Sequence, residues 1–420
     1  MSPISDVEST AGEIVTRELE NGLTILVQPM PWLRTAAFTL SIRAGIQNEA
    51  QDQSGLASMV CEMVQRGAGH HSSRDLVAIQ DNLGIDRTSG VATPTVSFGA
   101  AMPAESLPEG IRLYADVVRR PHLPADQLDD ARMMMMHELR AIEDEPTQRV
   151  MRRLRELHYG PRLGRGGHGT MESLSSINAD HVRDFYQSHY HAGGAIVSVA
   201  GNVDADAVID DIEAAFGDWK SAEVDPAPEP EGESVYEHLE ADSAQTHLAF
   251  SFPNIPYGHP DYFRMRAGIG ILSDGMSSRL FDRVREKRGL CYTVSASCHS
   301  LINAGGVFGY AGSTPDKIQE TFDVTFREIK CLTEDLSVAE LDRWKVRIES
   351  LLIMEQESSA SRASSLASDR YQLGRAMPTE ELSALIESLT LDAVRDYWDR
   401  NPPKDFRVVT LGPEPLVVHL

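Results

Sequence analysis

Three side chains that could take part in catalysis lie close together in SGLASMVCEMVQRGAG, residues 54–69. Ser58, Cys61 and Glu62 are spaced i, i+3 and i+4, so on a helix they would share one face. This face is a catalytic group, the remains of one, or part of a core. A glycine precedes the predicted helix, and its apolar residues indicate that it is buried: Leu56, Met59, Val60, Met63 and Val64.

The chemistry that suits this spacing is zinc hydrolysis, because a helix can supply two metal ligands at i and i+4. Such a site needs three nitrogen, sulfur or carboxylate ligands, an open position for water and a general base near that water. Ser58 offers only a hydroxyl, which is a very poor zinc ligand. None of the 14 histidines lies four residues from another. The conceivable replacements are loop histidines, which are usually solvated: His70, His71, His189 and His191.

Cys61 could instead act as a nucleophile. That role needs a base, an oxyanion hole and a reactive thiol, whereas apolar surroundings raise the pKa of a thiol. A buried structural cysteine is therefore the preferred interpretation. The chain has four cysteines and no C-x-x-C spacing, which indicates neither a disulfide framework nor a cysteine zinc site and favours a reducing compartment.

A second candidate pair lies in SSRLFDRVREKRGLCYTVSA, residues 277–296. Ser277 or Ser278 can cap a helix here, and Gly289 suits the position just after its last turn. Arg285 then projects from that last turn and Tyr292 from the strand that follows, so the two side chains can converge on one point. An exposed, salt-bridging arginine and a half-buried tyrosine would explain the same pattern.

The elements that position these residues fall into two halves. The stretch KSAEVDPAPEPEGESVYEH, residues 220–238, is rich in proline and glutamate and cannot form a core element. A chain of 420 residues also suits two domains better than one. We therefore predict an N-terminal domain over 1–219, a linker over 220–238 and a C-terminal domain over 239–420.

The two halves look related. INADHVRDFYQ begins at Ile177, and LTLDAVRDYWD begins at Leu389, 212 residues later. At the same offset IVSVAG from Ile196 meets VVTLG from Val408. A helix and the buried strand after it thus recur without a gap, which favours an internal duplication.

Strands and runs of helices alternate in each half, which predicts the α+β class. TRELENGLTILVQPM reads as a hairpin around Asn21-Gly22. Helices are expected at about 105–119, 124–143 and 146–159, and again in the stretch from 315 to about 370. We predict two homologous α/β sandwich domains, each with a mostly antiparallel sheet covered by helices.

The formal charge of −24 argues against nucleic-acid binding, which needs a basic patch. It serves solubility or attracts basic ligands such as cationic peptides. The N-terminus MSPISDVESTAGEIVTRELENG has no basic and apolar regions of a signal peptide, and no apolar run approaches the roughly 20 residues of a membrane helix. A cytoplasmic protein that does not bind membranes is the expectation.

GLASMVCEM resembles the G-L-A-H-x-x-E-H-M segment of the pitrilysin/insulinase family of zinc peptidases, the inverzincins. The resemblance runs from about residue 15 to 412. It includes SSRDLVAIQDNLGIDRTSG, LPEGIRLYADVVRRPHLPADQLDDAR, HELRAIEDEP and SRLFDRVREKRGLCYTVSA. The departure falls on the chemistry: Ser58 and Glu62 stand at the two histidine positions and Cys61 at the general base, while Glu138 matches the third ligand. The resemblance therefore implies a degenerate zinc motif and no metal in this chain.

Arg285 and Tyr292 match an arginine and a tyrosine that, in the family, bind the substrate backbone and stabilise the oxyanion at the zinc site. The resemblance implies the zinc-less subunit of a heterodimeric metalloendopeptidase, inactive alone. Its partner would be a zinc-bearing H-x-x-E-H subunit, and its substrate an unfolded peptide added as a strand to a sheet edge. Two alternatives stay open: an inactive scaffold or peptide-binding protein, and an independent hydrolase with a metal at Cys61, Glu62 and Glu138.

Overall fold

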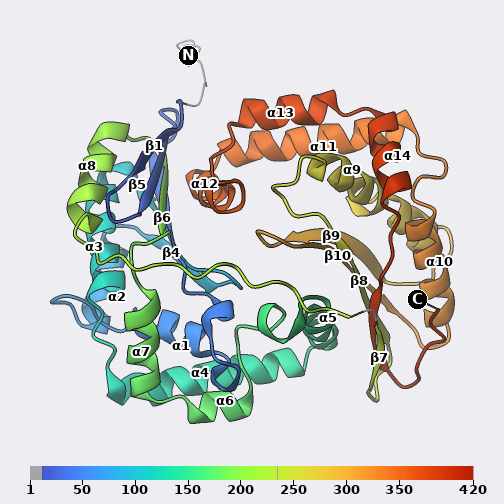
Figure 1. The fold of residues 1–420 in the computed structure, drawn as a ribbon, viewed down its shortest axis with the longest axis horizontal. Helices are drawn as coiled ribbons and strands as arrows, with labels where there is room; N and C mark the ends of the chain where they lie inside the picture. The colour runs from blue at the N-terminus through green and yellow to red at the C-terminus, as the bar shows by residue number, and fades with distance from the viewer. Residues whose placement is uncertain (1–11, 234, 420) are drawn as a thin grey trace, which may run out of the picture. The chain divides into compact units, whose positions relative to one another are not determined.

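The computed structural model describes residues 12–233 and 235–419, which divide into two compact units (Figure 1). Neither unit is continuous in sequence, because each takes one segment from the other half of the chain. No helix in the described ranges is long and apolar enough to cross a membrane. Unit 1 comprises the described residues 12–137, 167–226 and 352–378, and unit 2 comprises 138–166, 227–233, 235–351 and 379–419.

The sheet of unit 1 has its strands in the order β1-β2-β6-β3-β5-β4. β2 and β6 run parallel, and the other neighbours run antiparallel. The first two strands form the hairpin that Asn21-Gly22 predicts: Gly22 has a φ of +84°, and Asn21 Nδ2 donates to the carbonyl of Phe216 at 2.8 Å. The strands are β1 (Val15–Glu18), β2 (Thr24–Pro29), β3 (Thr35–Ile42), β4 (Asp86–Val91), β5 (Val96–Pro103) and β6 (Ile196–Gly201).

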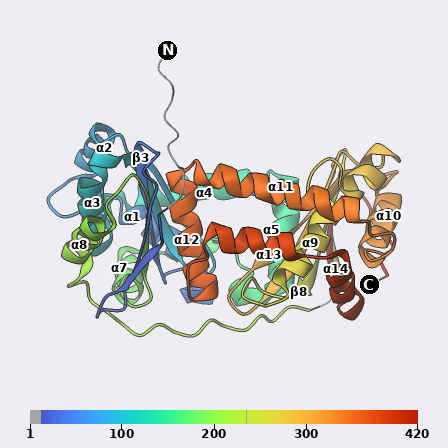
Figure 2. The ribbon, with the colours of Figure 1, turned by 90° about the horizontal axis from the view of Figure 1, so that it is seen from above.

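Helices cover both faces of this sheet. Successive side chains of a strand point to opposite sides, so the buried strands have apolar side chains on both faces that need cover. Phe38 of β3 packs edge-on against Tyr114 of α3, whereas its neighbour Ala37 packs with Ala363 of α12. α12 lies against β3 and β6 on that second face (Figure 2). The helices of unit 1 are α1 (Leu56–Met63), α2 (Ser73–Asn82), α3 (Leu107–Arg119), α6 (Met171–Ser176), α7 (Ala179–His189), α8 (Ala205–Phe216) and α12 (Ser359–Leu373). Short 3₁₀ turns are η1 (Ile46–Asn48), η2 (Gln51–Gln53), η3 (Ala104–Ser106) and η4 (Ala125–Gln127).

Unit 2 repeats this plan with the strand order β7-β11-β8-β10-β9, in which β7 and β11 run parallel. Its strands are β7 (Val235–Glu240), β8 (Thr246–Asn254), β9 (Thr293–Ser300), β10 (Gly305–Ser313) and β11 (Arg407–Gly412). Its helices are α5 (Pro146–Leu163), α9 (Tyr262–Ser273), the π-helix η5 (Phe281–Glu286), α10 (Ile318–Lys330), α13 (Thr379–Ser388) and α14 (Leu391–Arg400). Two further helices, α4 (Leu128–Glu143) and α11 (Val338–Gln356), each contain residues of both units.

The duplication predicted from the sequence is confirmed by the matching order and direction of the strands. α14 follows α7, and β11 follows β6, at the offset of about 212 residues. β8 stands at the same offset from β3. The chain therefore consists of two homologous α+β sandwiches, as the fold class predicts.

The repeat also shows that the two halves exchange one helix. α5 and α12 are equivalent in the repeat, yet α5 packs on β8 and β11 of unit 2, and α12 packs on β3 and β6 of unit 1. Apolar side chains of α5 and of α12 are fully buried at these contacts, among them Leu154 and Leu366. Each sheet thus depends on a helix from the other half of the sequence.

Candidate functional site

The helix predicted around residue 60 is α1, and a carboxylate holds its first turn. The backbone N–H of Gly55 donates to Glu49 Oε2 at 3.1 Å, and the N–H of Ala57 donates to Glu49 Oε1 at 2.9 Å. Glu49 is buried, so this negative group satisfies two N–H groups where the helix dipole favours an anion. Gly55 has a φ of +92°, which a residue with a side chain rarely adopts. Local chemistry therefore fixes where α1 begins, and sequence reasoning missed Glu49.

Cys61 is buried within unit 1. Burial raises the pKa of its thiol to about 12, although a hydrogen bond with Ser89 acts in the opposite direction. Cys61 is only 5% exposed, and its thiol is neutral near pH 7. A nucleophilic cysteine needs an accessible thiolate, so the geometry favours the structural interpretation.

Glu62 is held by Arg66, which lies just beyond the C-terminal end of α1. Arg66 Nε and Nη2 both donate to Glu62 Oε1, at 3.1 and 3.0 Å. Arg66 also donates from Nη1 to the carbonyl of Gln127 at 3.4 Å. The carboxylate of Glu62 is therefore neutralised by a guanidinium that a divalent cation would have to displace. The i, i+4 spacing of Glu62 and Arg66 was a readable signal that sequence reasoning did not use.

The remaining candidates do not complete a donor set. Ser58 is partly buried beside Gly167. The two residues are so close that a Cβ added at Gly167 would lie 3.2 Å from Ser58 Oγ. Glu138 is exposed on α4 and belongs to unit 2. Within residues 12–233 and 235–419, no three His, Cys, Asp or Glu side chains form a group that could hold a metal ion. These residues do not fit the zinc centre that the peptidase motif implies.

His189 and His191 do not supply the missing ligands, and His189 is the last residue of α7 instead of a loop residue as predicted. The pKa of His189 and that of His191 are both lowered, mainly by burial. A lowered pKa keeps an imidazole neutral and able to bind a metal. Neither histidine belongs to a metal-binding group in the described ranges, however.

A polar cavity of about 400 Å³ opens beside the Glu62 face of α1. Two guanidinium groups, those of Arg66 and Arg87, and one carboxylate, that of Glu62, line it. Ser89 Oγ accepts a hydrogen bond from Gln65 Nε2 at 3.2 Å on the same side of β4. The cavity beside Glu62 thus carries a local excess of positive charge.

Arg285 lies on η5, which is a π-helical turn instead of the α-helix that the spacing predicts. Its N–H groups reach one residue further back than in an α-helix, as the bond from Lys287 N to the Asp282 carbonyl at 2.9 Å shows. Gly289 ends the turn with a φ of +57°, which agrees with its predicted position. The guanidinium carbon of Arg285 lies 4.7 Å from the ring centroid of Phe281. Its side chain stays 42% exposed.

A buried ion pair anchors the turn that carries Arg285. Arg279 Nε and Nη2 bind the two carboxylate oxygens of Glu340 at 2.7 and 3.0 Å. Arg279 Nη1 also donates to the carbonyls of Leu332 and Glu334. The Arg279 side chain is only 2% exposed, so this arginine fixes the start of the turn to the first turn of α11 and to the segment before it.

Tyr292 stands directly before β9, and its side chain is 61% exposed. Its backbone N–H donates to the carbonyl of Gly312 at 2.9 Å, which fixes the main chain while the phenol extends outward. η5 and β9 are in contact. The structure therefore places Arg285 and Tyr292 on neighbouring elements of unit 2, and the tyrosine is more exposed than the half-buried alternative assumed.

Two family profiles match the chain. Residues 24–166 match the profile described as insulinase (peptidase family M16), and residues 176–347 match the one described as the peptidase M16 inactive domain. The chain belongs to the M16 peptidase family. The segment carrying Ser58, Cys61 and Glu62 lies in the first match, and Arg285 and Tyr292 lie in the M16 inactive domain.

Relatives in several bacteria span almost the whole M16 chain. A protein of Rickettsia felis described as an uncharacterized zinc protease is 27% identical over 90% of this chain and 92% of its own length. One from Bacillus subtilis with the same description is 24% identical over 94% of this chain and 97% of its own length.

Two solved structures share the fold. A Pseudomonas fluorescens structure described as a peptidase M16 inactive domain has a TM-score of 0.85 at 21% identity and covers 97% of this chain and 100% of its own. A protease from Helicobacter pylori has a TM-score of 0.86 at 18% identity, covering 96% and 100%.

Proposed function

We propose that this chain is the non-zinc subunit of a heterodimeric M16 metallopeptidase. The observation that carries the proposal is an asymmetry between two sites. On α1 the carboxylate of Glu62 is already paired with Arg66, and the thiol of Cys61 is buried. On unit 2, Arg285 and Tyr292 are exposed on anchored backbone. Among the described residues, unit 2 thus offers donors for a carbonyl oxygen, while no group of side chains is arranged to hold a metal ion.

The two donors suit the charge that develops when a peptide bond is attacked. A guanidinium and a neutral phenol can both donate hydrogen bonds to an oxyanion, and such preorganised donors stabilise a tetrahedral intermediate. Arg285 would hold a substrate carbonyl, and Tyr292 would donate its hydroxyl proton in a hydrogen bond to the scissile carbonyl oxygen. An H-x-x-E-H partner would supply zinc, which lowers the pKa of the attacking water.

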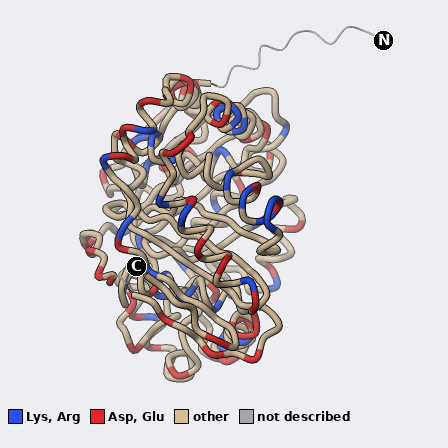
Figure 3. The backbone as a smooth tube through the Cα atoms, turned by 90° about the vertical axis from the view of Figure 1, so that its right-hand side faces the viewer, with Lys and Arg blue, Asp and Glu red and all other residues tan. Residues whose placement is uncertain are grey.

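The substrate class is an unfolded peptide that extends a sheet edge. β4 is the last strand of the unit 1 sheet, and five of its six residues are exposed. An unpaired edge strand offers backbone N–H and C=O groups to an extended peptide. Figure 3 shows Lys and Arg interspersed with Asp and Glu along the described chain, which does not suggest a phosphate-binding stripe.

The test is reconstitution with an M16 chain that carries H-x-x-E-H, using cleavage of a quenched fluorogenic peptide. The pair should cleave, and each chain alone should not. Tyr292→Phe removes one oxygen and should lower kcat/KM by about a hundredfold or more while the pair still forms. Arg285→Gln should also lower it, whereas Arg288→Gln, on an exposed arginine three residues on, serves as the matched control.

A scaffold or peptide-binding protein of the same fold predicts a different outcome. The two chains would associate, and Tyr292→Phe would leave any cleavage by the partner unchanged. Cleavage at the parental rate by the Tyr292→Phe pair would therefore refute the oxyanion role and favour the scaffold.

A further inference from the structure

A cavity on unit 1 lies beside the open edge of the sheet, on the face opposite α1. In the described part of the chain, β4 pairs with β5 alone. The register places Asp86 opposite Ala101 and Thr88 opposite Gly99, so these side-chain positions face one side of the sheet. Arg87 faces the other side, where it donates a hydrogen bond to Gln80.

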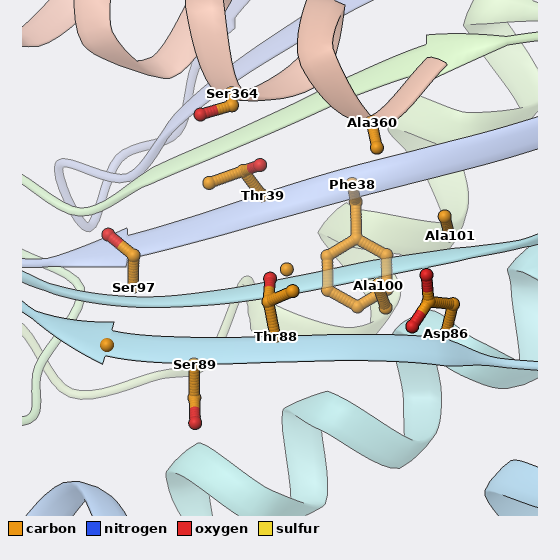
Figure 4. A pocket seen from close by; sticks show the side chains of 12 residues that line it. Phe38, Thr39, Asp86, Thr88, Ser89, Ser97, Ala100, Ala101, Ala360 and Ser364 are labelled. Carbon is orange, nitrogen blue, oxygen red and sulfur yellow. The ribbon is translucent and has the colours of Figure 1, made fainter. Parts of the chain in front are cut away.

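The packing of α12 explains why the cavity exists. α12 lies mainly over β3 and β6, so it leaves the β5–β4 end of the face open. Its residues at this end are small, Ala360 and Ser364, and Gly99 of β5 adds no side chain. The result is a cavity of about 310 Å³, with α12 on one side and β4 on the other (Figure 4).

The lining of the cavity has one charged group. Among the described residues that form it, Asp86 alone has a charged side chain, and the remaining polar side chains carry hydroxyls, such as those of Thr88, Ser97 and Ser364. Ala101 and Ala360 provide small apolar surface. The carboxylate of Asp86 lies at the end of the cavity beside Ala101 and Ala360, and the hydroxyls follow toward the other end (Figure 4). A carboxylate next to small apolar surface matches a side chain with an apolar stem and a cationic head.

We propose that this cavity binds a lysine or arginine side chain of an extended peptide that pairs with β4. Neighbouring strands lie about 4.8 Å apart, and every second side chain of the added strand would point to the face of Asp86 and Thr88. The cavity is at the small end of ligand sites, which run from about 300 to 1,000 Å³, so it suits one side chain. The intervening peptide residue would face Arg87 on the opposite side, where a second basic residue is disfavoured.

This proposal rests on the proposed function, because the peptide is the substrate that the subunit would help to hold. The probe is a fluorescein-labelled nine-residue peptide of serine, threonine and valine with a central lysine, arginine, glutamine or glutamate. Binding to the full chain alone is measured by fluorescence anisotropy at low ionic strength. The lysine and arginine peptides should bind about three- to tenfold more tightly than the glutamine peptide, and the glutamate peptide more weakly.

The variants separate the cavity from the general negative charge of the chain. Asp86→Asn should abolish the preference for lysine over glutamine, and Asp86→Glu should retain it. Asp81→Asn removes the same charge from an exposed position on α2 outside the cavity and should retain the preference. A preference that survives in Asp86→Asn would mean attraction by net charge only and would overturn the proposal.

Failure of this inference is distinguishable from failure of the proposed function. If lysine and glutamine peptides bind equally while the reconstituted pair loses activity in Tyr292→Phe, the cavity assignment alone is wrong. If Asp86 selects lysine while Tyr292→Phe cleaves normally, the oxyanion role alone is wrong. Both measurements use the full chain.

Discussion

The exchange of α5 and α12 makes a quantitative prediction for Leu366→Ala. Leu366 lies on α12, late in the sequence, yet it is fully buried against the sheet of unit 1, which is built from early strands. Truncating a buried leucine leaves a cavity and costs about 2–5 kcal/mol of unfolding free energy. At about 1.4 kcal/mol per factor of ten, even the lower value lowers the hydrogen-exchange protection of affected amides about thirtyfold.

The assay is hydrogen exchange measured by mass spectrometry on the native full chain. Leu366→Ala should accelerate exchange in β3 and β6, which contact α12, more than in β8 and β11. Leu154→Ala on α5 should do the reverse, because Leu154 is fully buried in the unit 2 sheet cluster. Val346→Ala, at a side chain that is 61% exposed on α11, is the control and should change stability by less than about 0.5 kcal/mol. Accelerated exchange in β8 and β11 alone for Leu366→Ala would refute the exchanged arrangement.

The remaining predictions concern the metal, the thiols and the pH dependence. After dialysis against zinc and washing, the purified chain should retain well under one zinc ion per chain, as measured by plasma mass spectrometry. Tightly held stoichiometric zinc would contradict the pairing of Glu62 with Arg66. Cys61 should resist a thiol reagent at pH 8 until the chain unfolds, because burial raises the pKa of its thiol to about 12; rapid native labelling at Cys61 would show that this burial is wrong. Burial tends to raise the pKa of Glu340, but its bonds with Arg279 and Ser337 outweigh burial and bring the pKa to about 2. Since the pKa of Glu340 is lower in the folded chain, its ion pair stabilises the fold above pH 4.5, and this stabilisation is lost as the pH falls toward 2. Glu340→Gln should therefore reduce the change in unfolding free energy over that pH range by roughly 1–2 kcal/mol. An unchanged pH dependence would show that the Arg279–Glu340 pair is not its source.

Local elements were readable because the signals that form them are local. The glycine at Gly55 and the apolar spacing after it predict α1, and Asn21-Gly22 predicts the first hairpin. The predicted helices 105–119, 124–143 and 146–159 correspond to α3, α4 and α5, with starts or ends that differ by up to four residues. The internal repeat was predictable for a related reason: the same hydrophobic pattern at one sequence offset indicates the same helix followed by the same strand.

Contacts between distant segments were not readable in the same way. The apolar residues of α12 predict a buried helix face, but burial of apolar surface has no direction and does not say which sheet will cover it. The π-helical form of η5 depends on a bond from Lys287 to Asp282 and on the anchor at Arg279, whose partner Glu340 lies far along the chain. Spacing alone therefore predicted an α-helix there.

The residue types of the candidate site were predictable from the sequence, whereas the pairing of their side chains was not. The resemblance implies that Ser58, Cys61 and Glu62 stand at the positions of a metal motif, but it does not say which group pairs with the Glu62 carboxylate. In the structure Arg66 neutralises Glu62 in an internal ion pair. The cavity at Asp86 was not predicted, because it arises from where α12 stops covering the sheet.

The exchanged helices set an order for folding during synthesis. The strands of unit 1 have all been synthesised once Gly201 is added, but the helix that shields their second face ends at Leu373. Until then that face, with Leu26 and Ile196 on it, stays open to water and to other chains. The nascent first half therefore needs protection by a chaperone or by transient self-association, and a ribosome stalled shortly before α12 should display an aggregation-prone intermediate.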